Sequence, residues 1–301
     1  MDHAPAVTER DVKRMNYPKI TVVTPSYNQA QFLEETILSV VGQQYPNLEY
    51  IIIDGGSTDG SVEVIRKYQE KIAYWVSEPD NGQAHAIHKG FERASGDILA
   101  WLNSDDFYLP GTLTFAAAQM DPTQAQLLFG NCLHLYEDSG AVSGSSVRRE
   151  HAHRNLLLTD YIVQPSSFWT RLAMNQTGAL DQTLHFGFDW EWFIRALQAG
   201  VKFIAEDKYL SVYRFHRDHK SGVGGKRRLQ ELAAVYERHA GARYERLFLR
   251  CCAARSRVVY CREKVRLMRL AESEGVLLKA LFPLLFRGFS SSEVADVVSM
   301  L

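Results

Sequence analysis

The stretch ASGDILAWLNSDDFYLPGTL (Ala94–Leu113) decides the fold of this chain, because it joins a buried strand to a pair of carboxylates. Its apolar run Ile98–Leu102 is short and continuous, which is typical of a strand buried on both faces of a parallel sheet. Asp105 and Asp106 follow that run, and an apolar helix is predicted over Thr112–Met120. A strand that ends in acidic residues and returns through a helix is a basic unit of α/β folds.

Three more carboxylates have the same kind of place in the sequence. Asp54 closes an apolar run, Asp80 follows another, and Asp189 opens a helix predicted over Asp189–Gln198. Ligands of parallel α/β sheets bind in the crevice beyond the carboxyl ends of the strands. We therefore expect these carboxylates and the Asp105-Asp106 pair to meet around one pocket. Such a cluster suits a divalent cation, a ribose and a proton-accepting base.

Strands and helices alternate through the first half of the chain, at roughly 25 residues per unit. The predicted strands are Ile20–Thr24, Tyr50–Ile53, Ala73–Ser77, Ile98–Leu102 and Leu127–Leu135, and the predicted helices are Phe32–Val41, Val62–Tyr68, Gln83–Ala94 and Thr112–Met120. This alternation predicts right-handed βαβ crossovers and an α/β fold with a Rossmann-like, mostly parallel sheet flanked by helices.

The pattern changes after Gly140. We expect a mobile loop over Ser139–Ser146, a strand over Val163–Thr170, and two short strands over Val201–Ala205 and Lys208–Tyr213. The chain then divides into a flexible N-terminus (1–17), a domain at 18–225 with halves 18–135 and 136–225, and a helical, basic C-terminal extension (226–301).

Composition and charge narrow the class of protein. The chain has 301 residues, of which 46% are hydrophobic and 23% charged, as in ordinary globular proteins. Residues 226–301 carry a charge of +7 and the remainder −8. The four cysteines have no zinc spacing, residues 1–17 lack the apolar core of a signal peptide, and no apolar run is long enough to span a membrane. We therefore expect a cytoplasmic protein with reduced thiols.

The tail leaves two interpretations open. Arginines alternate with apolar residues over Arg243–Arg269, and the segment VLLKALFPLLF follows within Gly275–Phe289. This pattern is typical of contact with the inner surface of a membrane, and equally of a packing or oligomerisation face. We do not expect nucleic-acid binding, because no aromatic platform accompanies the arginines.

Seven motifs in order resemble the family-2 glycosyltransferases, which are inverting enzymes of the GT-A fold. They are VVTPSYNQ (Val22–Gln29), IIDGGSTDGS (Ile52–Ser61), SEPDNGQAHAIHKGF (Ser77–Phe91), ASGDILAWLNSDDFYLPGTL (Ala94–Leu113), QPSSFWTR (Gln164–Arg171), FDWEWFIRAL (Phe188–Leu197) and YRFH (Tyr213–His216). The resemblance implies a nucleoside-diphosphate sugar as donor, most often linked to uridine diphosphate, and thymidine and guanosine sugars are alternatives. It also implies a hydroxyl of a glycan, lipid-linked or protein acceptor, in the biosynthesis of a surface polysaccharide or glycan.

The transfer needs a base for the acceptor hydroxyl and a counter-charge for the leaving diphosphate. The resemblance aligns Asp189 with the catalytic base, although an aspartate at a helix start is also a common N-cap. Glu191 is the alternative candidate for the catalytic base. The resemblance places Asp105, Asp106 and His216 around Mn²⁺ or Mg²⁺. The alternative for the acidic pair is an ordinary turn.

Donor binding is expected from residues near the strand ends. The resemblance implicates Thr24, Pro25, Tyr27, Asp54, Asp80, Lys89 and Asn103, together with Asp105 and Asp106. Two positions depart from the family pattern. Asn103 stands where the family's D-x-D motif usually begins, and Asp54-Gly55 stands where the second strand usually ends in two aspartates.

Two other functions remain open. One is a non-catalytic nucleotide-sugar-binding assembly partner that keeps the fold, but such a protein has no use for a base at Asp189. The other is a nucleotidyltransferase, which would want a Gly-rich, basic loop after the first strand, and VVTPSYNQ lacks one.

Overall fold

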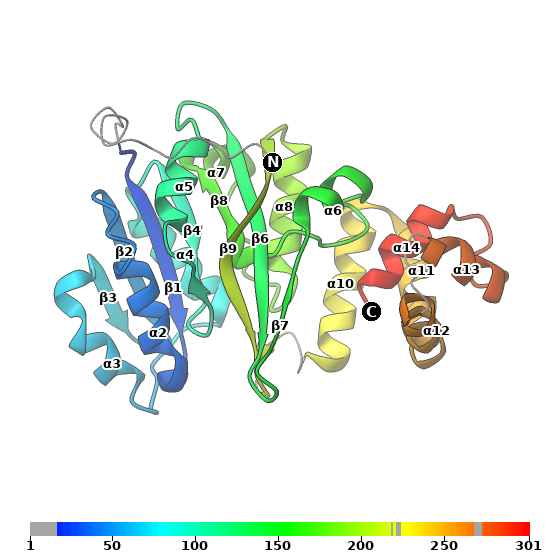
Figure 1. The fold of residues 1–301 in the computed structure, drawn as a ribbon, viewed down its shortest axis with the longest axis horizontal. Coiled ribbons are helices and arrows are strands. Elements are labelled where there is room, and N and C mark those ends of the chain that lie inside the picture. Colours follow the sequence, from blue (N-terminus) through cyan, green and yellow to red (C-terminus); the bar gives the residue numbers. More distant parts are fainter. Residues whose placement is uncertain (1–16, 218, 221–223, 268–272) are drawn as a thin grey trace.

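The computed structural model describes residues 17–217, 219–220, 224–267 and 273–301. The expected flexible N-terminus (1–17) lies outside these residues except for Tyr17, whose ring packs edge-on against Tyr45. A twisted sheet with helices on both faces forms the larger part of the molecule, and a group of helices extends from one end of it (Figure 1).

The first half of the sheet is parallel. Its strands are β1 (Ile20–Ser26), β2 (Leu48–Asp54), β3 (Tyr74–Ser77) and β4 (Ile98–Trp101), in the order β3-β2-β1-β4. The intervening helices are α2 (Ala30–Val41), α3 (Ser61–Lys67), the short 3₁₀ turn η1 (Gln69–Lys71) and α4 (Gln83–Arg93). This order confirms the Rossmann-like α/β half predicted from the sequence.

The second half of the sheet mixes directions. Its elements are β5 (Phe107–Tyr108), α5 (Thr112–Gln119), β6 (Gln126–Tyr136), β7 (Ala141–Gly144), α6 (Val147–His153), η2 (Gln164–Ser166), β8 (Ser167–Thr170), α7 (Arg171–Thr177), α8 (Phe188–Gln198) and β9 (Lys202–Phe215). The order continues as β4-β8-β6-β9-β5. β6 and β9 are parallel, whereas β8, β5 and β7 run antiparallel to their neighbours.

Three sequence expectations were wrong in this half. The loop expected over Ser139–Ser146 contains β7, whose exposed small residues give no alternating pattern because the hairpin with β6 has no buried face there. The strand expected over Val163–Thr170 begins with a 3₁₀ turn and becomes extended only at Ser167. The two strands expected between 201 and 213 are the single strand β9. Its pairing with β6 shifts in register between Ala205 and Tyr209, and Asp207 in this segment accepts a hydrogen bond from Asn131.

Alternation along the strands builds a core on each face of the sheet. In β2, Ile51 and Ile53 pack on the face covered by α4 and α8, whereas Tyr50 and Ile52 pack on the face covered by α2, α3 and α5. All four side chains are buried. Burial on both faces explains why the strand reads as a continuous apolar run.

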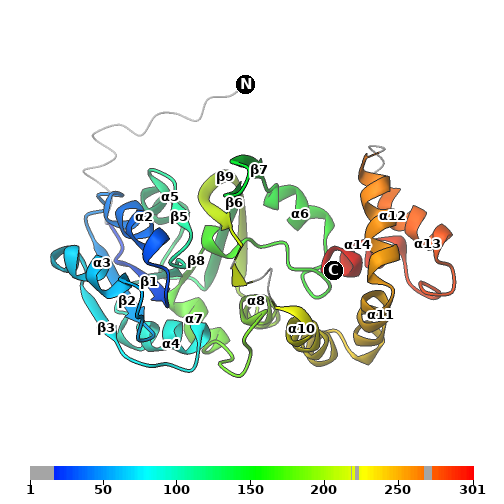
Figure 2. The ribbon, with the colours of Figure 1, turned by 90° about the horizontal axis from the view of Figure 1, so that it is seen from below.

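The C-terminal extension is helical, as expected. It consists of α10 (Gly225–His239), α11 (Ala242–Ala253), α12 (Arg255–Leu267), α13 (Glu274–Leu281) and α14 (Ser291–Ser299). Figure 2 shows α10 between α8 of the sheet domain and the more distant α11 and α12. The apolar core of the extension is continuous with the sheet core on the α8 side, because Tyr236 joins both. In the described part of the chain, no helix is both long and apolar enough to cross a bilayer.

The contact between α4 and β1 depends on Gly90. A Cβ at this position would lie 2.4 Å from Cγ1 of Val23, which is closer than packed carbon atoms approach. We expect Gly90→Ala to lower the free energy of unfolding by about 1–2 kcal/mol, since overpacking outweighs the gain in helix propensity. Urea denaturation would measure this loss. Adding Val23→Ala should restore about 1 kcal/mol relative to the sum of the single changes. Strict additivity would show that the two sites do not touch.

Candidate active site

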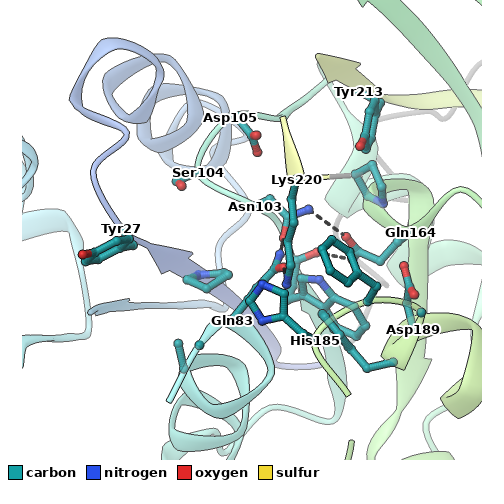
Figure 3. Close-up of a pocket in the computed structure, with 18 of the residues that line it drawn as sticks. Tyr27, Gln83, Asn103, Ser104, Asp105, Gln164, His185, Asp189, Tyr213 and Lys220 are labelled. Atoms are coloured by element: carbon teal, nitrogen blue, oxygen red, sulfur yellow. Dashed lines mark hydrogen bonds between the residues drawn. The ribbon is translucent and has the colours of Figure 1, made fainter. Parts of the chain in front are cut away.

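A cavity of about 980 Å³ lies beyond the carboxyl ends of β1, β2 and β4. Asp105 and Asp189, which are 84 residues apart in the sequence, both line it. In Figure 3, Tyr27 lies on one side of this cavity and Asp189 on the other, with Gln83, Asn103 and Lys220 between them. The sequence predicted that Asp54, Asp80, Asp189 and the Asp105-Asp106 pair meet around one pocket; Asp80, Asp105 and Asp189 line this cavity, and Asp54 and Asp106 do not.

Tyr27, Gly55 and Asp80 form the end that lies above β1 and β2. Tyr27 is 63% exposed, so it is not a core residue. A Cβ at Gly55 would lie 2.8 Å from Oδ2 of Asp80 and 3.3 Å from the ring of Tyr27. The carboxylate of Asp80 thus fills the space that a side chain at position 55 would need. This close approach explains the glycine that departs from the family pattern. Pro25 completes this end of the cavity.

Asp54 does not line the cavity. Its side chain is fully buried, and its two oxygens accept hydrogen bonds from the backbone N–H groups of Gly56 and Ser57 and from the hydroxyls of Ser57 and Ser77. A carboxylate with four donors holds the loop after β2 in shape and has little capacity for a ligand.

Two other expected donor contacts are also turned away from the cavity. Thr24 is buried and its hydroxyl lies 3.1 Å from that of Tyr50. Lys89 forms an ion pair with Glu78, with its Nζ 2.5 Å from the carboxylate. Neither residue lines the cavity. Sequence position on the helix after Asp80 therefore did not predict where the ammonium points.

Polar side chains connect the floor of the cavity. Gln83 Nε2 donates to Oδ1 of Asn103 at 2.6 Å, and Nζ of Lys220 donates to Oε1 of Gln83 at 2.7 Å. Gln164 Nε2 donates to the carbonyl of Trp101. Oε1 of Gln164 then lies 3.5 Å from Nδ2 of Asn103. Gln83 and Gln164 were not singled out from the sequence, because neutral amides give no signal without knowledge of their partners.

Asp105 and Asp106 are adjacent but have different environments. Oδ2 of Asp105 lies 3.1 Å from Nε2 of His216, and Asp105 lines the cavity. Asp106 is 1% exposed and accepts hydrogen bonds from the backbone N–H of Arg214 and from Nδ2 of Asn103. Burial, with the neighbouring Asp105, raises the pKa of Asp106 well above its ordinary value. Asp106 therefore shapes the turn and does not face the cavity.

Arg214 fixes this turn from β9. Its Nε donates to the carbonyl of Asp105, and its two other nitrogens form ion pairs with Glu35 and Glu137. The guanidinium also lies over the ring of Phe32, 4.8 Å from its centre. The side chain is 6% exposed, so these contacts replace water almost completely.

A divalent cation would find only part of its ligands here. Within residues 17–267 and 273–301, excepting 218 and 221–223, no three His, Cys, Asp or Glu side chains come together as a metal site. Asp105 nevertheless lines the cavity, and Nε2 of the buried His216, which does not line it, lies 3.1 Å from Oδ2 of Asp105. Mg²⁺ and Mn²⁺ are commonly bound by one or two protein carboxylates plus substrate phosphates. The pair fits an ion whose remaining ligands come from a diphosphate.

Asp189 lies at the opposite end, in the first turn of α8. Its Oδ1 accepts a hydrogen bond of 2.9 Å from the backbone N–H of Trp190. Burial raises the pKa of Asp189, and this backbone hydrogen bond opposes the rise. Glu191 faces elsewhere: it is 1% exposed and forms an ion pair with Arg195. Glu191 is therefore not available as a base, because its carboxylate is buried in the ion pair with Arg195.

Two more ionisable groups line the cavity near Asp189. Asp160 comes from the segment between α6 and η2, and its Oδ1 has no hydrogen-bond partner in the described part of the chain. Burial, with the nearby Asp189, raises the pKa of Asp160 well above its ordinary value. Burial lowers the pKa of Lys220 to about 8, against the opposing attraction of Asp189. Asp160 lies in no motif, so the sequence offered no signal for it.

Asp160 should cost stability at neutral pH. A carboxyl whose folded pKa is raised contributes most to stability below its unfolded pKa of about 4, and loses that contribution as the pH rises through the folded pKa. Asp160→Asn mimics the neutral form. We expect it to raise the free energy of unfolding on the order of 1 kcal/mol at pH 7.5 and to change it little at pH 4.5. Urea denaturation at both pH values would test this, with the exposed Asp138→Asn as control. A loss of stability at pH 7.5 would contradict it.

The chain is similar in sequence to known glycosyltransferases. A family model described as glycosyl transferase family 2 matches residues 21–175. An uncharacterized glycosyltransferase of Haemophilus influenzae is 41% identical over 96 residues, which are 31% of this chain and 38% of that protein. The putative teichuronic acid biosynthesis glycosyltransferase TuaG of Bacillus subtilis is 41% identical over 92 residues, 30% of this chain and 36% of that protein. The matched segments thus span little more than a third of these relatives.

Solved structures show the same fold at low sequence identity. S. aureus TarS 1–349 in complex with UDP-GlcNAc has a TM-score of 0.59 and 17% identity, over 72% of this chain and 65% of that one. The mannosyltransferase PcManGT from Pyrobaculum calidifontis, in complex with GDP-Man and Mn²⁺, has a TM-score of 0.57 and 22% identity, over 73% and 64% of the two chains. The GT-A fold is therefore confirmed. Because the family model covers just over half of the chain, the protein belongs to glycosyl transferase family 2.

Proposed function

We propose that the protein is an inverting glycosyltransferase, which moves a sugar from a nucleoside-diphosphate sugar to a hydroxyl of an acceptor. The observation that carries this proposal is the shared cavity, which Asp105 and the partly exposed Asp189 both line, with Nε2 of the buried His216 3.1 Å from Oδ2 of Asp105. A leaving diphosphate and an attacking hydroxyl need such groups on opposite sides of the reacting carbon. We take residues 18–225 as the catalytic unit and 226–301 as its extension.

Asp189 is the proposed base. As the acceptor oxygen forms its bond to the anomeric carbon, the bond from that carbon to the diphosphate oxygen breaks, and the hydroxyl proton passes to the carboxylate of Asp189. The raised pKa of Asp189 improves its match to a proton acceptor at neutral pH. Inversion follows because attack and departure occur on opposite faces of the sugar ring.

The diphosphate would lie between Asp105 and Lys220. Asp105 and His216 would hold Mn²⁺ or Mg²⁺, which would neutralise negative charge on the diphosphate. Mn²⁺ in the PcManGT complex supports this choice of cofactor. Lys220 is half-buried over the rings of Phe186 and Phe188, at 5.6 and 5.2 Å from their centres, and its ammonium donates to Gln83 on the cavity floor.

The nucleoside would occupy the end formed by Pro25, Tyr27 and Asp80. The exposed ring of Tyr27 offers a stacking surface for a base. Uridine diphosphate is the proposed nucleotide, and the UDP-GlcNAc complex of TarS supports it.

Surface polysaccharide or glycan synthesis is the proposed setting, and the name of TuaG supports it. The acceptor would be a glycan, a lipid-linked sugar or a protein, at the cytoplasmic face of the membrane. Exposed Val276, Leu281 and Leu284, with Lys279 and Arg287 beside them in the sequence, are consistent with shallow contact with an anionic membrane surface. The same apolar side chains would also serve in a contact between copies of the chain.

Nucleotide binding and transfer are separable tests of this function. Thermal shift with UDP, GDP and TDP, each with and without Mn²⁺ or Mg²⁺, should show a metal-dependent rise in Tm for one nucleotide. No rise with any of them would remove the donor-site assignment.

Asp189→Asn should lower kcat by at least about 10³-fold, while the Kd for that nucleotide changes less than twofold, because the base acts only on the acceptor. Transfer would be followed by release of nucleoside diphosphate from the donor sugar. The surface variant Asp138→Asn should behave like the wild type. Loss of nucleotide binding in Asp189→Asn would move Asp189 out of the base role, and unchanged kcat would favour a different base.

Lys220 should limit transfer at alkaline pH. Its pKa of about 8 means that its charge is present below pH 8 and lost above it. We expect kcat/KM, which reports the free enzyme, to fall above about pH 8. Lys220→Arg should move this fall to higher pH, because a guanidinium stays protonated. An alkaline limb that is identical in wild type and Lys220→Arg would assign it to another group.

A further inference from the structure

The C-terminal extension forms part of the cavity wall. Arg228 and Leu232 of α10, and Ser299 and Met300 at the end of α14, line the cavity together with Asp160 and Asp189. These residues lie beyond the segment that the family model matches. The extension therefore has a place in the site itself, in addition to any role at a membrane or between subunits.

Specific hydrogen bonds hold α14 against the segment that precedes η2. The carboxylate of Asp296 accepts hydrogen bonds from Nη1 of Arg154 and from the backbone N–H of Asn155, both at 3.2 Å. The hydroxyls of Thr159 and Ser299 are 2.6 Å apart. The backbone N–H of Asp160 points to the sulfur of Met300 at 3.2 Å. The position of Asp160 in the cavity thus depends on α14.

α10 holds the opposite side of the same wall. Glu231 accepts hydrogen bonds from the backbone N–H groups of His185 and Phe186, at 2.8 and 2.5 Å. These two residues lead directly into α8, which carries Asp189. The hydroxyl of Tyr236 donates to the carbonyl of Leu158, which ties α10 to the segment that carries Asp160. Both sides of this end of the cavity are therefore built on the extension.

Arg228 is the unpaired charge in this wall. It is only partly exposed, yet its guanidinium has no hydrogen bond or ion pair with any residue that the structure describes. Asp160 and Asp189 act on it electrostatically but neither reaches ion-pair distance, and Arg255 of α12 adds positive charge nearby. A partly desolvated cation with five free donors is costly unless a ligand supplies acceptors.

We propose that Arg228 and the surrounding ends of α10 and α14 form an acceptor subsite for an oxyanion group, so that the physiological acceptor carries a phosphate or a carboxylate close to the hydroxyl that attacks. This inference rests on the proposed transferase function. A guanidinium binds either oxyanion through two parallel hydrogen bonds, which also orients the ligand.

The placement of Arg228 favours the acceptor over the donor diphosphate. The groups that act on it are Asp160, Asp189, Arg255 and Tyr213, and neither Asp105 nor Lys220, between which the diphosphate would lie, is among them. An anion bound at Arg228 would also place negative charge near Asp189. Like charge makes a carboxylate a stronger proton acceptor, so binding of the acceptor would assist the base.

Small sugars that differ only in charge test this subsite in the full-length protein. With the donor site saturated by the nucleoside diphosphate and Mg²⁺, the Kd of methyl glucoside, methyl glucuronide and glucose 6-phosphate would be measured by titration calorimetry or ligand-observed NMR. We expect one of the charged sugars to bind at least about tenfold more tightly than methyl glucoside. The stronger of the two identifies the oxyanion as carboxylate or phosphate.

Arg228→Gln should abolish that preference, with a nucleotide Kd within twofold of wild type, and Arg228→Lys should keep part of it. Lys226→Gln removes the same charge from an exposed position on the same helix and should leave the preference intact. Equal binding of all three sugars by the wild type, or a preference that survives Arg228→Gln, would overturn the inference. Loss of nucleotide affinity in Arg228→Gln would also overturn it and assign Arg228 to the donor. Failure of the wild type to bind any nucleotide would instead remove the proposed function.

Discussion

The anchoring of one turn by Arg214 is the interaction on which the site depends. The turn after β4 carries Asp105 toward the cavity. Arg214 of β9 holds this turn because its guanidinium donates to the carbonyl of Asp105 and its backbone N–H donates to the carboxylate of Asp106. The same guanidinium reaches Glu35 of α2. One buried side chain thus joins the parallel half of the sheet, the mixed half and a covering helix. Because the guanidinium contacts two carboxylates, one carbonyl and two aromatic rings, the turn has little freedom to move.

Local pattern was enough to predict the parallel half of the fold. Continuous apolar runs gave β1, β2 and β4, because strands covered on both faces need no polar alternation. The position of Asp105 and Asp189 at one cavity followed from the topology, since parallel strands end at the same edge. The hairpin of β6 and β7 was not predicted because β7 is exposed on both faces. A strand shows alternating apolar residues only where one of its faces is buried.

Individual side-chain directions could not be predicted in the same way. Asp54 ends β2 and Asp80 follows β3, yet Asp54 accepts three hydrogen bonds from the loop after β2 and one from Ser77 of β3, while Asp80 lines the cavity. The positions of Asp160 and Arg228 depend on contacts between residues that are 78 to 140 positions apart in the sequence. Their chemistry is invisible until those segments are brought together. The motifs of the sequence therefore describe the Tyr27 and Asp80 end of the cavity better than the end that Asp160 and Arg228 line.

The hydrogen bonds between α14 and residues 154–160 have a consequence for how proteins of this kind can diverge. Consider a chimera that received its last helix from another protein but kept its own residues 154–160. Arg154, Asn155 and Thr159 would then lose their hydrogen-bond partners Asp296 and Ser299. To preserve these contacts, both segments would have to be transplanted together, although 130 residues of chain separate them. The unit that must be exchanged is α14 together with residues 154–160, and these two segments are not contiguous in the gene.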